Sequence, residues 1–224
     1  SLEDAKSISF KKGNNGLQLA EAGTKQACAI PYDMDVNFVV DRDKQTLTIS
    51  FQVGGKLPAQ KVVGVPFFAK SAVPFGEQSE LDRVFNFAVK PNESIHYKWA
   101  FDKFVGDKID MEVYGPNGFY RRFAFSKKNV PAAVTVVAAD HHRGLQLKAS
   151  PSSIELSIEH AAYGHAAKQV TKGKTSAHTW DLTRSSGWYH LEVTSKDDDQ
   201  LLLIYAGHQE NGKPSITDPI MGGK

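Results

Sequence analysis

Hydrophobic and polar residues alternate along most of this chain. The clearest case is the run 45–53, in which Leu47, Ile49, Phe51 and Val53 share one face of an extended segment. A period of two is typical of a half-buried strand, because successive side chains point to opposite faces of the sheet. Similar runs lie at residues 35–40, 83–89, 108–114 and 119–125. The first half of the chain is therefore predicted to consist of short strands.

The second half shows the same pattern. Strands are predicted at residues 134–138, 144–149, 153–158, 188–195 and 201–207, and tight turns at residues 41–44, 115–118 and 197–199. The alanine-rich segment 159–171 is the ambiguous piece, where a turn of helix is expected. Short strands separated by turns at this spacing indicate an all-β sandwich or barrel.

The two halves also resemble each other. Trp99 precedes the pair Glu112-Val113 by nearly the same number of residues as Trp180 precedes the pair Glu192-Val193. Gly106 and Gly187 lie inside these intervals, and the pairs Phe123-Ala124 and Tyr205-Ala206 follow them. Internal similarity of this kind indicates a repeated structural unit.

We therefore predict two tandem immunoglobulin-like antiparallel β-sandwich domains. The first is expected at residues 29–128 and the second at residues 129–224, behind an N-terminal extension at residues 1–28. The boundary falls in the polar stretch 126–131. The Cys-Trp-Cys signature of antibody domains is absent, since Cys28 is the single cysteine.

Charge and composition exclude several classes of function. The chain of 224 residues has 27 Lys and Arg against 25 Asp and Glu, a net charge of +2. Nucleic acid is not expected as a partner, because phosphate binding needs clustered cations. No apolar run is long enough for a membrane span. The opening residues lack the form of a signal peptide, and we expect the chain to be part of a longer protein.

Histidines gather in the second half without a metal-site spacing. Seven of the eight follow Pro131: His141, His142, His160, His165, His178, His190 and His208. Residues two apart share a face of a strand, and no His-x-His occurs. A metal site needs convergent ligands, so we predict neither a metal nor another cofactor.

No catalytic constellation is evident either. The sequence contains no Gly-x-Ser-x-Gly elbow and no phosphate-binding Gly-rich loop. The carboxylates of residues 197–199 fall in a turn, which favours solvation over acid–base work. We predict no catalytic residue in this chain, and a small hydrolase with an unrecognised site is the opposing hypothesis.

Two segments combine aromatic rings with cations or with strand starts. They contain the lipid-contact candidates Phe119, Tyr120, Arg121, Arg122, Trp188 and Tyr189. Guanidinium groups bind phosphate and amphipathic rings favour a membrane interface. The opposing interpretation is an ordinary solvated strand face for the arginines. Trp99 and Trp180 are predicted to pack across the sandwich core.

Several stretches resemble one family. The segments 186–193, 205–212 and 215–219 resemble the closing part of the bacterial phosphocholine-specific phospholipases C. The turn Gly115-Pro116-Asn117-Gly118 and its flanks resemble the end of a preceding copy of the same domain, and the segments 21–25 and 29–32 resemble the linker and the opening strand. The resemblance runs from about Glu21 to Pro219.

The resemblance implies a function for the whole polypeptide. Enzymes of this family are secreted hydrolases that release phosphocholine from phosphatidylcholine or sphingomyelin, and their catalytic residues lie in an N-terminal domain outside this chain. It implies a non-catalytic accessory region, secreted or periplasmic, that partners the catalytic domain and a phospholipid surface. A free-standing carbohydrate- or protein-binding sandwich is the alternative.

Overall fold

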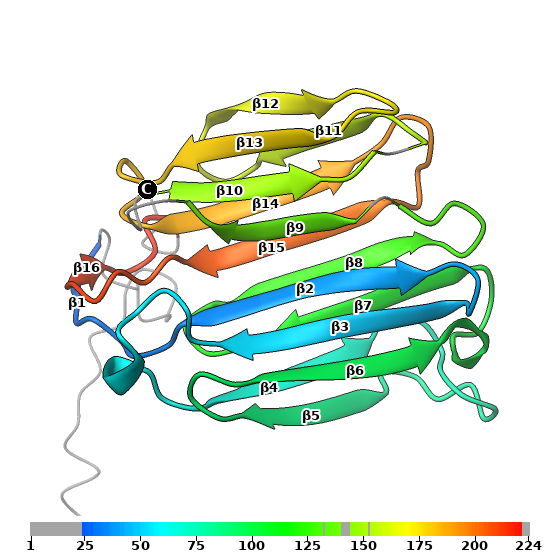
Figure 1. Cartoon of the computed structure of the whole chain (residues 1–224), viewed down its shortest axis with the longest axis horizontal. Coiled ribbons are helices and arrows are strands. Elements are labelled where there is room, and N and C mark those ends of the chain that lie inside the picture. Colours follow the sequence, from blue (N-terminus) through cyan, green and yellow to red (C-terminus); the bar gives the residue numbers. More distant parts are fainter. Residues whose placement is uncertain (1–23, 132, 140–143, 152, 221–224) are drawn as a thin grey trace, which may run out of the picture.

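The computed structural model describes residues 24–131, 133–139, 144–151 and 153–220. They form a two-layered antiparallel β-sandwich, which confirms the predicted all-β class (Figure 1). The described part contains two 3-10 turns, η2 (Ala59–Lys61) and η3 (Phe101–Lys103), and no α-helix. No helix in these residues is long and apolar enough to cross a membrane.

Each half of the molecule supplies seven strands in the same order. The first half consists of β2 (Met34–Asp41), β3 (Thr46–Val53), β4 (Val65–Ser71), β5 (Val84–Val89), β6 (Ser94–Ala100), β7 (Lys108–Tyr114) and β8 (Tyr120–Ser126). The second half consists of β9 (Val134–Ala138), β10 (Gly144–Ala149), β11 (Leu156–His160), β12 (His165–Val170), β13 (Ser176–Asp181), β14 (Trp188–Thr194) and β15 (Leu202–His208). Two short strands, β1 (Gln26–Ala27) and β16 (Ser215–Ile216), pair with each other at one end.

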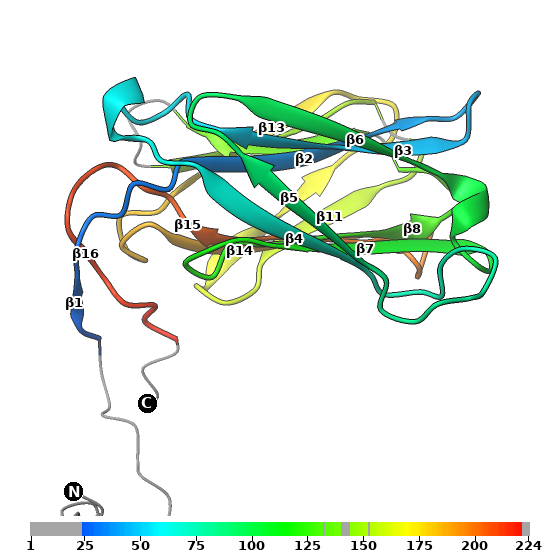
Figure 2. The same cartoon turned by 90° about the horizontal axis from the view of Figure 1, so that it is seen from below.

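One layer is a single sheet that runs through both halves. Its order is β12-β11-β14-β15-β8-β7-β4-β5, and the halves meet where β15 pairs with β8 at the register Arg122↔Ile204. The other layer holds two three-stranded sheets, β13-β10-β9 and β2-β3-β6, which lie side by side across the first layer (Figures 1 and 2). Corresponding strands of the two halves therefore occupy corresponding places in the layers.

The second joint is made by a side chain. Asn37 of β2 accepts a hydrogen bond from the amide of Val136 at 2.9 Å and donates to the carbonyl of Val136 at 3.4 Å. The amide group of Asn37 thus replaces one residue pair of a backbone ladder between β2 and β9. Two different devices join the halves, a full ladder in one layer and a side-chain amide in the other.

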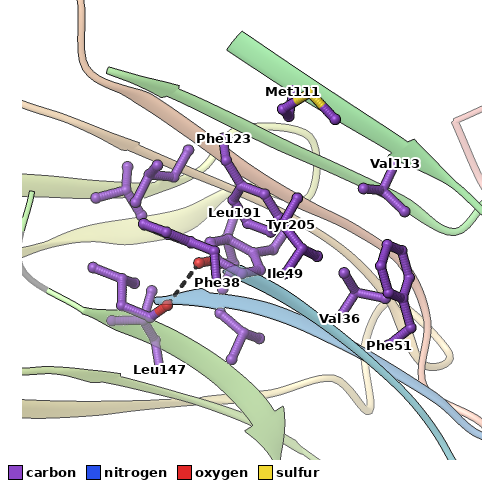
Figure 3. Close-up of a cluster of buried hydrophobic side chains, with 14 of the residues drawn as sticks. Val36, Phe38, Ile49, Phe51, Met111, Val113, Phe123, Leu147, Leu191 and Tyr205 are labelled. Atoms are coloured by element: carbon purple, nitrogen blue, oxygen red, sulfur yellow. Dashed lines mark hydrogen bonds between the residues drawn. The ribbon is translucent and has the colours of Figure 1, made fainter. Parts of the chain in front are cut away.

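Buried side chains form one continuous core. Leu47, Ile49 and Phe51 from the first half and Leu191 and Val193 from the second are all fully buried in the same cluster. The Phe38 and Phe123 rings lie 4.7 Å apart, and the Tyr205 ring of the second half lies 5.9 Å from the Phe123 ring of the first (Figure 3). The Tyr205 hydroxyl donates to the carbonyl of Val134 at 2.8 Å. The two halves therefore share one core, to which inward-facing side chains at the β8–β15 joint contribute.

Most of the predicted strands are present within two or three residues of their expected limits. The segment 159–171 is different: it contains the end of β11, a turn and β12, and no helix. Two of its alanines, Ala161 and Ala162, lie in the turn, and the other two, Ala166 and Ala167, lie on the edge strand β12. Strands β4, β6, β12 and β13 and the two-residue strands β1 and β16 were not predicted.

Candidate functional site

The two segments that carry the lipid-contact candidates meet at the joint between the halves. The turn before β8 is built on Asn117 and Gly118, whose φ angles of 56° and 69° are left-handed, a conformation that these residue types tolerate best. A Cβ atom on Gly118 would lie 3.5 Å from the Trp188 ring. The turn therefore packs directly against the start of β14.

Arg121 lies inside the sandwich, with 1% of its surface exposed. One terminal nitrogen donates to the carbonyls of Tyr120 and Ala206 at 2.9 and 2.8 Å, and the other donates to the Tyr189 hydroxyl at 2.9 Å. Its guanidinium carbon is 4.0 Å from the centroid of the Phe119 ring. Backbone carbonyls and aromatic faces thus replace water around the charge.

This burial overturns the solvated strand face considered for Arg121. Phe119, Trp188 and Tyr189 are also buried, with 3%, 9% and 4% of their surfaces exposed. The Trp188 indole nitrogen is engaged too, since it donates to the carbonyl of Ile216 at 3.0 Å. These four side chains hold β7–β8, β14 and β16 together. Their contact with lipid stays a prediction, and the fold gives them a packing role.

Tyr120 and Arg122 lie on the outer face of the eight-stranded sheet and are half-buried. Arg122 forms a two-pronged ion pair with Asp110, at 2.9 and 2.8 Å, and Lys108 lies 2.8 Å from the same carboxylate. Burial of Asp110 opposes its ionisation, but the two cations outweigh this and hold its pKa below 3.8. Burial and the neighbouring Glu112 carboxylate raise the pKa of Tyr120.

A second cluster, which the sequence did not reveal, follows the end of β15. Its members are Glu210, His208 and Ser215. His208 Nδ1 lies 2.6 Å from a Glu210 carboxylate oxygen, and its Nε2 lies 3.1 Å from Ser215 Oγ. Both side chains of the His208–Glu210 pair are 6% exposed. The order of carboxylate, imidazole and hydroxyl resembles that of a hydrolase triad.

The hydrogen bonds of His208 argue against that chemistry. Nε2 also lies 2.9 Å from the carbonyl oxygen of Ser186, and an acceptor at that distance requires a proton on the nitrogen. The contact between Nδ1 and Glu210 is satisfied with the proton on either atom. With its own proton directed at Ser186, Nε2 has no lone pair for the Ser215 proton, which is itself donated to the carbonyl of Ser186 at 2.9 Å. We interpret the cluster as a hydrogen-bonded group that fixes the chain after β15.

A cavity of about 580 Å³ lies beside this cluster. It is lined by Ser186, Gly187, Gln209, Ser215 and Ile216 among others. Only the spacing His208-x-Glu210 could have been noticed from the sequence, because residues two apart on an extended chain share a side. Ser186 and Ser215 reach the site through long-range pairing and carry no local signal.

The remaining histidines do not converge. Among the described residues, no group of three His, Cys, Asp or Glu side chains is placed to hold a metal ion. His190 pairs with Glu192 at 3.0 Å, and His178 lies 3.2 Å from the carbonyl of Gln169. His141 and His142 fall outside the described residues.

Comparison with known proteins identifies the family. The model of the bacterial phospholipase C C-terminal domain matches residues 26–124 and again residues 129–208. The non-hemolytic phospholipase C of Burkholderia pseudomallei is 27% identical over 212 residues, which cover 90% of this chain and 28% of that protein. The hemolytic phospholipase C of Pseudomonas aeruginosa is 27% identical over 234 residues, which cover 90% of this chain and 30% of that protein.

The chain thus spans less than a third of the length of these relatives. The family model matches twice, and its two matches contain the seven strands of the first half and those of the second almost completely. The chain belongs to the bacterial phospholipase C C-terminal domain family.

Proposed function

We propose that this chain is the non-catalytic accessory region of a secreted or periplasmic bacterial phospholipase C. The parent enzyme would release phosphocholine from phosphatidylcholine or sphingomyelin, through residues of a separate catalytic domain. Residues 29–128 and 129–224 would be two copies of the C-terminal domain. The observation that carries this proposal is the double family match, combined with relatives of which this region forms less than a third.

The chemistry of the described residues supports a non-catalytic role. The one triad-like cluster, Glu210–His208–Ser215, has a hydrogen-bond pattern that leaves no base for the hydroxyl. The Arg121 guanidinium, which could have bound phosphate, is committed to internal partners. Docking on the catalytic domain is therefore the favoured role. Any contact with lipid is assigned to the exposed parts of the Tyr120 and Arg122 side chains.

A turnover assay tests the proposal. Chain 1–224 and the full-length polypeptide are incubated with phosphatidylcholine, and free phosphocholine is measured. We expect release by the full-length polypeptide and none by chain 1–224. Release by chain 1–224 that survives repurification and disappears in Ser215→Ala would establish the opposing hydrolase hypothesis.

A second arm separates docking from lipid engagement. Chain 1–224 is sedimented with phosphatidylcholine vesicles at low and moderate salt, beside Tyr120→Ala and Arg122→Ala. Binding that persists at moderate salt and falls in both variants supports lipid engagement, because insertion of rings is screened less than a surface charge. Absence of sedimentation leaves docking as the role.

A further inference from the structure

The two halves differ most at their free sides. β5 and β12 end the eight-stranded sheet, and β6 and β13 end the two three-stranded sheets (Figure 1). The open side of the first half therefore lies between β5 and β6, and that of the second half between β12 and β13. Equivalent positions follow from the strand pairings, so the two sides can be compared residue by residue.

The open side of the first half is lined with aromatic rings. We call Phe85, Phe87, Tyr97 and Trp99 the aromatic edge. The Tyr97 and Trp99 rings lie 4.5 Å apart, and the Phe85 and Phe87 rings lie 5.4 Å from Trp99 and Tyr97 respectively. Tyr97 remains 42% exposed, although it belongs to this cluster.

The open side of the second half is apolar at two of the four equivalent positions, Trp180 and Val170, and polar at the other two. Pairing with β10 places His178 opposite Leu147, as pairing with β3 places Tyr97 opposite Ile49. Pairing with β11 places Lys168 opposite Ile158, as pairing with β4 places Phe85 opposite Ala69. The second half thus has His178 and an exposed Lys168 where the first half has Tyr97 and Phe85.

Strand β5 also lacks the usual protection of an edge. Its sequence, Val-Phe-Asn-Phe-Ala-Val, contains no charged residue, whereas β12 contains Lys168. The backbone amide of Ser71 donates to the carbonyl of Arg83. Along an antiparallel pair every second residue bonds to the partner strand, so the backbone amides of Val84, Asn86 and Ala88 face away from β4. An uncharged, aromatic edge strand with free amides pairs readily with another chain unless it is covered.

A groove continues from this edge onto the outer face of the sheet. It has a volume of about 540 Å³ and is lined by Phe68, Phe87, Tyr114 and Pro116 among others. Phe68 and Tyr114 are 37% and 36% exposed, and their rings lie 5.2 Å apart. An extended segment paired with β5 would place alternate side chains in the groove and against the aromatic edge.

We propose that the aromatic edge and β5 are the docking site for an extended segment from the catalytic portion of the same phospholipase polypeptide. The inference rests on the proposed function. The matched region makes up only 28% and 30% of two relatives, so most of each relative lies outside it. A segment tethered in the same polypeptide meets the edge at a high effective concentration, which a second copy of this chain does not.

Hydrogen exchange tests the proposal. The outward amides of β5 are expected to exchange about tenfold or more slowly in the full-length polypeptide than in chain 1–224, because a paired amide exchanges only when the pairing opens. The amides of β12 are expected to exchange alike in both. Unchanged exchange of β5 would overturn the proposal. So would a dimer of chain 1–224 in sedimentation analysis that protects β5 itself.

A matched pair of variants assigns the surface. Tyr97→Lys in the full-length polypeptide is expected to return β5 exchange to the rate of chain 1–224, and His178→Lys at the equivalent position is expected to change nothing. Equal effects of the two variants would overturn the assignment. Deletion of this region from the full-length polypeptide tests the underlying function separately. If deletion alters neither phosphocholine release nor stability, the accessory role fails; if it alters either while β5 stays unprotected, only the docking site fails.

Discussion

The two halves of this molecule share an interior and differ at their margins. Leu47 faces Trp99 in the first half, and Leu145 faces Trp180 in the second, so the core positions match. At the open sides, Tyr97 corresponds to His178. Packing restricts the interior of both halves to the same arrangement, whereas residues at the edges have fewer neighbours and are free to differ.

The joint between the halves is unequal as well. Arg121 pairs with Tyr205 across the joint. Two residues along the same ladder, Phe123 pairs with Leu203, so that Arg121 and Leu203 occupy equivalent positions of the two halves. The first half therefore contributes a buried cation where the second half contributes a leucine. If the molecule is one folded body, residues at this joint should affect its stability more than residues on the outer face.

The largest effect is expected for Arg121→Ala. The change removes a large buried side chain and leaves the Tyr189 hydroxyl and the Ala206 carbonyl without their donor. We expect a loss of about 3–5 kcal/mol in the free energy of unfolding, measured with denaturant. Arg122→Ala on the outer face is the matched control, with a smaller loss of about 1–3 kcal/mol, because Lys108 still faces the buried Asp110 carboxylate. Equal losses for the two arginines would contradict the difference in role.

A smaller effect is expected for Asp110→Asn, and it should depend on pH. The folded-state pKa of Asp110 lies below 3.8, so its stabilisation is present above the unfolded value and is lost as the pH falls through the folded value. Because the ion pair with Arg122 is partly buried, we expect a loss of about 1–3 kcal/mol at pH 7. The difference between variant and parent should shrink below pH 3.8. A difference that stays constant over this range would assign it to packing.

Asn37→Ala probes the other joint. The variant leaves the amide of Val136 without its acceptor, and the predicted loss is about 1–2 kcal/mol. Asn86, which is exposed on β5, provides a control that should change stability little when replaced by Ala. If both variants are neutral, the two three-stranded sheets are held by their shared core and not by this amide.

The smallest effect is expected for Ser215→Ala. The segment after β15 has no counterpart in the first half, where β9 follows β8 instead. Loss of the hydroxyl removes one hydrogen bond to Ser186, for which about 0.5–1.5 kcal/mol is typical. Phosphocholine release by the full-length polypeptide should be unchanged. A large fall in release at unchanged stability would return the triad hypothesis.

The sequence predicted those strands in which one face alternates strongly. β3 was predictable because its apolar residues Leu47, Ile49 and Phe51 alternate with polar neighbours. β4 contains Pro66 and the adjacent pair Phe67-Phe68, with one ring on each face, so the period is obscured. β6 does alternate, with Ile95, Tyr97 and Trp99 on one face, so its period was detectable from the sequence. β13 is too polar for a hydrophobic stripe to appear.

The candidate site was harder to predict for a related reason. Arg121 lies two residues from both Phe119 and Phe123, so the period of two places all three side chains on the same, buried face. Its charge nevertheless favoured a solvated interpretation, because the groups that satisfy it, Tyr189 and Ala206, are distant in the sequence. Long-range partners of this kind cannot be inferred from local pattern.

Calorimetric unfolding of Ile49→Ala and Leu147→Ala tests most directly whether the halves form one folded body. Both positions are fully buried at equivalent places in the shared core, and each truncation should cost about 2–5 kcal/mol. A single core predicts one cooperative transition in the parent and in both variants, lowered as a whole by either change. Two transitions, of which Ile49→Ala lowers only one and Leu147→Ala only the other, would contradict this account.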